Sequence, residues 1–95
     1  MKEIKIIFGV ERDKNNHIVY DIPIKLREVK FKTVTLFGGY TLIPHTGGWM
    51  NADNEIVEEA GYTLVLYTDK WELVQPFADD VKRIFNQAEV LVYGL

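Results

Sequence analysis

The chain contains no cysteine, so it has no disulfide, no thiolate zinc site and no thiol nucleophile. It also lacks an excess of positive charge, because its formal net charge is −3. A protein that follows a nucleic-acid backbone needs a basic face, so we expect no nucleic-acid partner. No apolar run approaches the length of a membrane span, and residues 1–10 lack a signal-peptide pattern, so we expect a cytoplasmic protein, in a cell or in a phage-infected host.

The residues that are present are typical of a folded domain. Hydrophobic residues make up 47% of the 95 positions and charged residues 26%, a balance that excludes disorder. This length predicts a single domain over residues 1–95. A core of this size leaves little room for a deep pocket within one chain.

The first half of the chain predicts a strand followed by a helix. The isoleucine-rich residues 3–10 favour a strand, and the wholly polar residues 11–17 form a loop. Asp21 stands at a helix N-cap position, with Pro23 in the first turn. Glycines at 38–39 end this helix.

The second half predicts a hairpin, a helix and a last strand. A strand over residues 40–44 and a turn at 51–54 lead into a long strand over 55–68, for which Ala60-Gly61 suggests a bulge or a bend. An apolar stripe from Val74 to Phe85 predicts the second helix, and residues 90–93 form the last strand.

This order of elements predicts an α+β fold, the ferredoxin-like βαββαβ sandwich with two helices on one face of an antiparallel sheet. The other face of such a sheet is free. Residues 62–68 are apolar on both faces of their strand. We therefore expect this strand to be central, with a partner subunit against its free face.

Glu58 and Glu59 are the most informative polar pair. Adjacent strand residues point to opposite faces, so at most one of them faces the helices. Either the pair lies on a solvated edge, or one carboxylate anchors a cationic or hydroxyl-bearing ligand. Gln87 ends the second predicted helix, and nothing in its local sequence distinguishes it.

The histidines and paired glycines carry weaker signals. His17 and His45 are far apart in sequence and do not form a metal motif, so we expect surface or hydrogen-bonding roles, with catalytic use of His45 left open. The glycine pair at 38–39 reads as a turn. The pair at 47–48 either forms a turn or brings backbone N–H groups close to a ligand.

Aromatic residues are numerous for this length. We expect most of them in the core or in a subunit interface, with one or two stacking on a purine ring. The candidates are Tyr40, Trp49, Tyr62, Tyr67 and Tyr93.

Short motifs in residues 36–95 follow one another in the order of a known family. They are Gly39-Tyr40, Gly48-Trp49, Glu58-Glu59, and Gln87 followed after two residues by Val90-Leu91-Val92-Tyr93. This pattern resembles the small phage S-adenosylmethionine (SAM) lyases, once called SAM hydrolases. A set of uncharacterised small bacterial domains shares the Gly-x-Trp hairpin and the glutamate.

The resemblance implies a ferredoxin-like homotrimer with active sites between neighbouring subunits. It also implies a reaction without cofactor or metal, in which the carboxylate of SAM attacks its own γ-carbon. The products are homoserine lactone and 5′-methylthioadenosine. Relatives that phages use against host defences, including CRISPR systems, cleave SAM or its AMP conjugate, SAM-AMP.

Carried over residue by residue, Glu59 or Glu58 would hold the sulfonium or the α-amine of the substrate. Gln87 would hydrogen-bond the substrate near the subunit boundary. Further substrate-binding candidates are Tyr40, Trp49, Gly48 and Tyr67. We expect the pocket where the strand of the two glutamates meets a neighbouring subunit.

Two other classes of function stay open at this point. One is a non-catalytic oligomeric module that binds and sequesters a nucleotide signal. The other is a structural or regulatory protein without a small ligand, with an aromatic-rich face buried in an obligate oligomer.

Overall fold

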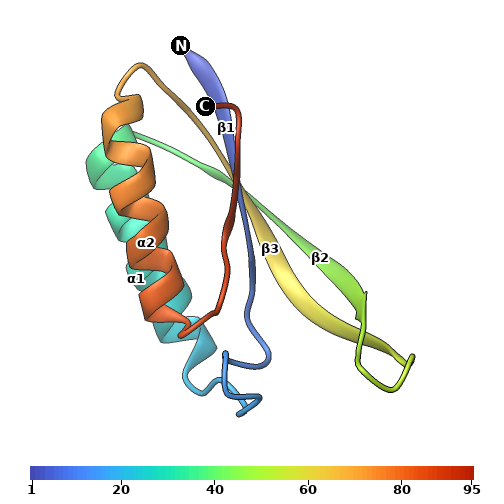
Figure 1. Cartoon of the computed structure of the whole chain (residues 1–95). Coiled ribbons are helices and arrows are strands. Elements are labelled where there is room, and N and C mark those ends of the chain that lie inside the picture. The colour runs from blue at the N-terminus through green and yellow to red at the C-terminus, as the bar shows by residue number, and fades with distance from the viewer.

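The computed structural model describes residues 1–95 as a four-stranded antiparallel sheet with both helices on one face (Figure 1). The elements are β1 (Lys2–Gly9), α1 (Ile22–Phe37), β2 (Thr41–Met50), β3 (Ile56–Thr68), a short 3-10 helix (Trp71–Leu73), α2 (Val74–Ile84) and β4 (Leu91–Tyr93). The strand order is β2-β3-β1-β4. The predicted α+β, ferredoxin-like fold is confirmed, with β3 in the interior of the sheet.

The hydrophobic core lies between the helices and one face of the sheet. Ile4, Ile6 and Phe8 of β1 point into this layer and pair with residues of β3 that point the same way, among them Leu64 and Leu66. The second helix adds four buried side chains at helical spacing. Helical periodicity made α2 predictable from sequence, whereas the strands were predicted from β-branched and apolar runs.

The first helix begins and ends where the sequence predicts. Pro23 lies in its first turn, and the backbone N–H of Gly38 donates to the Val34 carbonyl at 2.9 Å with a left-handed φ of 91°. Asp21 occupies the N-cap position, but its side chain makes no capping hydrogen bond and its backbone is left-handed at φ 58°. The position was predicted correctly and the side-chain role was not.

The β2–β3 hairpin is longer and more regular than predicted. The two strands pair one-to-one from Thr41 opposite Val65 to Met50 opposite Ile56, so of the bulge or bend predicted at Ala60-Gly61, the bulge is wrong. Glycines 47–48 lie within β2 and do not form a loop. The turn at 51–54 is confirmed, since the side chain of Asn51 accepts hydrogen bonds from two backbone N–H groups of this turn.

The β2–β3 hairpin extends beyond the end of β1. The paired part of β1 ends at Gly9, opposite Gly61, so β3 has only β2 as a strand partner beyond this point. The two strands continue as a twisted ribbon that projects away from the helices (Figure 1). No helix therefore covers either face of the ribbon, which includes Trp49 and Glu59.

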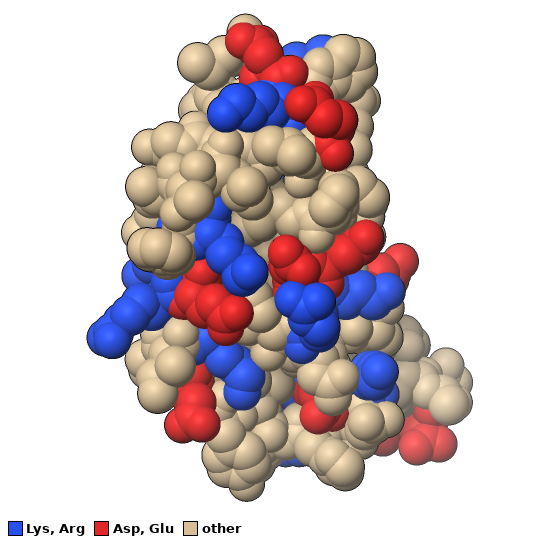
Figure 2. Space-filling model, turned by 90° about the vertical axis from the view of Figure 1, so that its left-hand side faces the viewer, with Lys and Arg blue, Asp and Glu red and all other residues tan.

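The two faces of the molecule differ in what they expose. On the helical face, basic and acidic side chains intermingle (Figure 2), with ion pairs from Asp80 to Lys32 and Arg83. The uncovered face of the sheet exposes apolar side chains, notably Ile43, Leu91 and Tyr93. Neither helix has the length and apolar character needed to cross a membrane.

Candidate functional site

The polar loop of residues 11–17 is held in shape by Asp13. Its Oδ1 accepts hydrogen bonds from the backbone N–H groups of Asn15 at 2.8 Å and His17 at 3.0 Å, and its Oδ2 accepts one from Nδ2 of Asn86 at 3.2 Å. The hydrogen bond from the His17 backbone is the largest of several effects that hold the pKa of Asp13 below its usual range. The loop is thus an ordered part of the site.

The end of α2 places Gln87 beside this loop. Asn86 adopts a left-handed φ of 50°, and the backbone N–H of Gln87 donates to the Lys82 carbonyl at 2.9 Å. With the bond from Asn86 N–H to the Arg83 carbonyl at 3.1 Å, this is a Schellman ending, which asparagine tolerates. The Asn86 carbonyl then accepts from the Lys14 N–H at 2.8 Å, so the loop docks on the helix end.

The Gln87 amide is oriented by two carbonyl groups. Its Nε2 donates to the Arg12 carbonyl at 2.8 Å and to the Phe85 carbonyl at 3.0 Å. Since both partners are acceptors, the nitrogen must face them, and both amide hydrogens are used. Gln87 Oε1 is left as an acceptor for a ligand.

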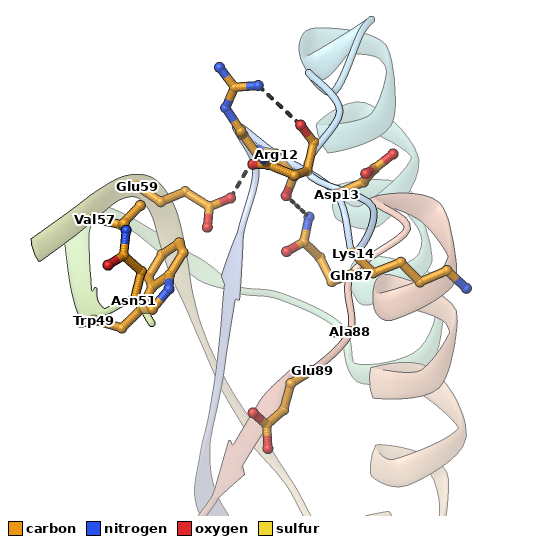
Figure 3. A pocket seen from close by; sticks show the side chains of 11 residues that line it. Arg12, Asp13, Lys14, Trp49, Asn51, Val57, Glu59, Gln87, Ala88 and Glu89 are labelled. Atoms are coloured by element: carbon orange, nitrogen blue, oxygen red, sulfur yellow. Dashed lines mark hydrogen bonds between the residues drawn. The ribbon is translucent and has the colours of Figure 1, made fainter. Parts of the chain in front are cut away.

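Glu59 bonds to the other backbone group of Arg12. Its Oε1 accepts a hydrogen bond from the Arg12 backbone N–H at 3.0 Å, and its side chain lies over Gly9. No cation lies within salt-bridge distance of it, because the Arg12 guanidinium turns to the Asn16 carbonyl at 3.1 Å (Figure 3). Glu59 is therefore a half-buried carboxylate whose charge has no partner within the chain and whose Oε2 is unused.

A cavity of about 700 Å³ opens between this cluster and the ribbon. The ribbon contributes Trp49, Asn51 and Val57, while Glu59 and Gln87 line the cavity from the centre and the helix side (Figure 3). A second cavity of about 400 Å³ adjoins it on the uncovered face of the sheet and shares four lining residues with it, Trp49, Glu59, Gln87 and Glu89. The site has two compartments with these residues at their junction.

The structure separates the two candidate glutamates. Glu58 pairs with Gly48 on the opposite face of the ribbon, is exposed and lines neither compartment. Glu59 and Gln87, in contrast, bond to the backbone N–H and the backbone carbonyl of Arg12, although 28 positions separate them in sequence. Of the candidate pair, only Glu59 is placed to contact a ligand in the two compartments.

The other substrate-binding candidates divide into two groups. Trp49 and Gly48 line the smaller compartment, and Trp49 lines the larger one as well. Tyr40 and Tyr67 line neither. Tyr67 lies eight residues beyond Glu59 along β3, which is roughly 26 Å at the rise of a strand. Within one chain these two tyrosines are not part of the site.

Sequence reasoning missed several residues of the site. Arg12 contributes through its backbone, which carries no sequence signal. Asn51 was interpreted only as a turn residue, although it also lines the larger compartment. Gly9 and Gly61 form part of the smaller compartment, and His45, whose use was left open, lines it beside them.

Comparison with known proteins gives a fold relationship. No protein-family model matches the chain, and no curated protein matches it. A solved phage SAM lyase in complex with S-methyl-5′-thioadenosine superposes with a TM-score of 0.70 and 14% identity, covering 96% of this chain and 77% of that one. The apo state of phage SAM lyase gives a TM-score of 0.69 at the same identity, with 96% and 76% covered. At this level of identity, the chain shares the fold of phage SAM lyase.

Proposed function

We propose that this protein is a carbon–sulfur lyase that cleaves SAM or SAM-AMP. The observation that carries the proposal is the pair of unused acceptor oxygens, Glu59 Oε2 and Gln87 Oε1, in residues that bond to the backbone N–H and the backbone carbonyl of Arg12 and line both compartments. The fold shared with phage SAM lyase supports the same assignment.

Two acceptors at one site suit a ligand group with several donors. An ammonium has three N–H donors and a positive charge, and Glu59 has no cation of its own. We therefore assign the α-ammonium of the substrate to Glu59 and Gln87. A half-buried carboxylate without a partner is costly, and the ligand supplies that partner.

The charge changes of the reaction favour the ammonium over the sulfonium as the partner of Glu59. The sulfonium loses its charge during cleavage, so a carboxylate held against it would stabilise the ground state more than the transition state. The ammonium keeps its charge throughout. Contact with it fixes the methionyl chain without opposing the reaction.

The bond changes need no proton transfer. The substrate carboxylate oxygen forms a bond to the γ-carbon, and the bond from this carbon to sulfur breaks. The electron pair leaves with sulfur, giving neutral 5′-methylthioadenosine and homoserine lactone. The role of the protein is to fold the methionyl chain into an attack geometry and to exclude water.

The proposal extends to the AMP conjugate and to an oligomer. Arg12 and Lys14 line the larger compartment, and cations of this kind suit the added phosphate of SAM-AMP. The exposed apolar side chains of the uncovered sheet face suit a homotrimer with sites completed between subunits. Such an activity fits phage counter-defence by removal of the nucleotide.

The test is incubation of the purified protein with SAM and, separately, with SAM-AMP, followed by chromatography and mass spectrometry. In water labelled with oxygen-18, lactone formation leaves the γ-oxygen unlabelled, whereas direct hydrolysis labels it. Decarboxylated SAM, which has no carboxylate nucleophile, is the matched substrate control and should stay intact. Light scattering of the same sample gives the oligomeric state.

Each negative result has a defined meaning. Recovery of intact SAM and SAM-AMP at high protein concentration would overturn the lyase proposal. Tight binding of either nucleotide, with the ligand recovered intact after denaturation, would select the non-catalytic binding module instead. A monomer that cleaves SAM would support the lyase proposal and contradict an active site shared between subunits.

A further inference from the structure

The smaller compartment has a floor made of backbone. Gly9 and Gly61 face each other across β1 and β3, and His45 is the partner of Gly61 on β2. All three line the compartment of about 400 Å³. Three neighbouring strands thus present two positions without side chains and one imidazole.

Both glycines are needed for the side chains that lie on this floor. A Cβ at Gly61 would lie 3.0 Å from Cε1 of His45 and 2.5 Å from the Phe8 carbonyl oxygen. A Cβ at Gly9 would lie 2.8 Å from the carboxyl carbon of Glu59. The imidazole of His45 therefore lies against Gly61, and the carboxylate of Glu59 lies against Gly9.

His45 carries a polar atom that the protein leaves without a partner. Its Nε2 is shielded from solvent and makes no hydrogen bond. An unsatisfied buried nitrogen costs stability, and packing alone would favour an apolar ring here. The reaction described above does not use this group. A ligand in the compartment would supply the missing partner once the imidazole turns Nε2 toward it.

We propose that the smaller compartment binds the nucleoside half of the substrate and that His45 is the residue that recognises it, through a hydrogen bond at Nε2. This inference rests on the proposed function. A planar ring suits a compartment bordered by Trp49, a residue that is 51% exposed and can stack on it. The shared Glu59 and Gln87 then hold the amino-acid half next to it.

The test uses 5′-methylthioadenosine as the probe in calorimetric titrations of the full chain. His45→Phe keeps a ring and removes the polar nitrogens, and we expect it to weaken binding at least tenfold. His45→Gln keeps a polar nitrogen and should stay within about threefold of the unchanged protein. His17→Phe, at the exposed loop histidine, is the matched control and should bind as the unchanged protein does.

A readout without substitution accompanies the titrations. In protein labelled with nitrogen-15, addition of 5′-methylthioadenosine should shift the Nε2 resonance of His45 and leave that of His17 in place. Unchanged binding by His45→Phe, an unshifted His45 resonance, or no binding of the probe by the unchanged protein would each overturn the inference.

The outcome is independent of catalysis. If SAM and SAM-AMP stay intact but the probe binds in a His45-dependent way, the nucleoside site stands and the lyase proposal fails. If SAM is cleaved and His45→Phe binds the probe normally, the lyase stands and the role of His45 fails. If His45→Phe does not fold, the affinity of His45→Gln for the probe and the shift of the His45 resonance test the inference instead.

Discussion

Beneath the helices, β1 and β3 bring Ile4, Ile6 and Leu64 to complete burial, whereas on the uncovered face the same two strands carry Gly9, Gly61 and Glu59. Packing explains the first set, because each side chain fills the core. The second set follows a different rule, because the two glycines leave room for the Glu59 carboxylate and the His45 imidazole. The difference teaches that side chains fill space on the covered face, whereas their absence on the uncovered face near the ribbon makes room for polar groups.

The largest loss of stability should come from removing a buried side chain between the helices and the sheet. Phe77→Ala removes a fully buried ring, and we expect a loss of about 3–5 kcal/mol in the free energy of unfolding. In an isolated subunit, Ile43→Ala, at a half-exposed position of the uncovered face, should cost less than about 1 kcal/mol. Denaturant titration measures both. Equal losses would mean that a partner subunit covers this face in solution, as in the proposed homotrimer, and that the two faces differ only within one chain.

The next largest effect should be a loss of activity that differs between the two glutamates on opposite faces of the ribbon. Glu59→Gln should lower kcat/KM for SAM about a hundredfold, because it removes the charge that holds the ammonium. Its unfolding free energy should change by less than about 0.5 kcal/mol, since glutamine still accepts from the Arg12 N–H. Glu58→Gln is the control on the opposite face. Similar losses in both variants would contradict the assignment of Glu59.

A smaller effect should follow from loosening the loop. Gln87→Leu removes the donor to the Arg12 and Phe85 carbonyls, which should cost about 1–2 kcal/mol of stability and roughly tenfold in kcat/KM. Gln75→Leu, which removes an exposed contact to Asp79 on the same helix, serves as the control. An active Gln87→Leu variant with full affinity for SAM would remove Gln87 from the site.

The smallest effect should appear in the pH dependence of stability. The pKa of Asp13 is lowered in the folded state, so its carboxylate adds stability above the unfolded-state pKa of roughly 3.9. This contribution is lost as the pH falls through the lowered folded-state value. Asp13→Asn should therefore be less stable than the unchanged protein near neutral pH, and the gap should close in acid.

Thermal unfolding between pH 3 and pH 7 measures that gap. Asp53→Asn, in the exposed hairpin turn, is the control and should show no gap at any pH. A gap that persists unchanged in acid would show that Asp13 does not act through its charge.

The sequence predicted which helices, strands and turns form better than it predicted how long the strands are. Helix ends at Pro23 and Gly38 and the turn at Asn51 were predictable because their conformational preferences are local. The length of β2 was not, because Gly47 and Gly48 have low strand propensity and are held in place by pairing with Glu59 and Glu58. Cross-strand hydrogen bonds overrode local preference there.

By itself, the sequence determined the order of the elements and the presence of an informative glutamate pair, since both depend on spacing along the chain. The tertiary structure alone decided that Glu59 and not Glu58 faces the compartments. It also decided that Glu59 and Gln87 meet at Arg12, from 47 and 75 positions away. The physical reason is that strand pairing sets the direction of the Glu59 side chain and the Schellman ending of α2 sets that of Gln87. No short stretch of the sequence contains both residues.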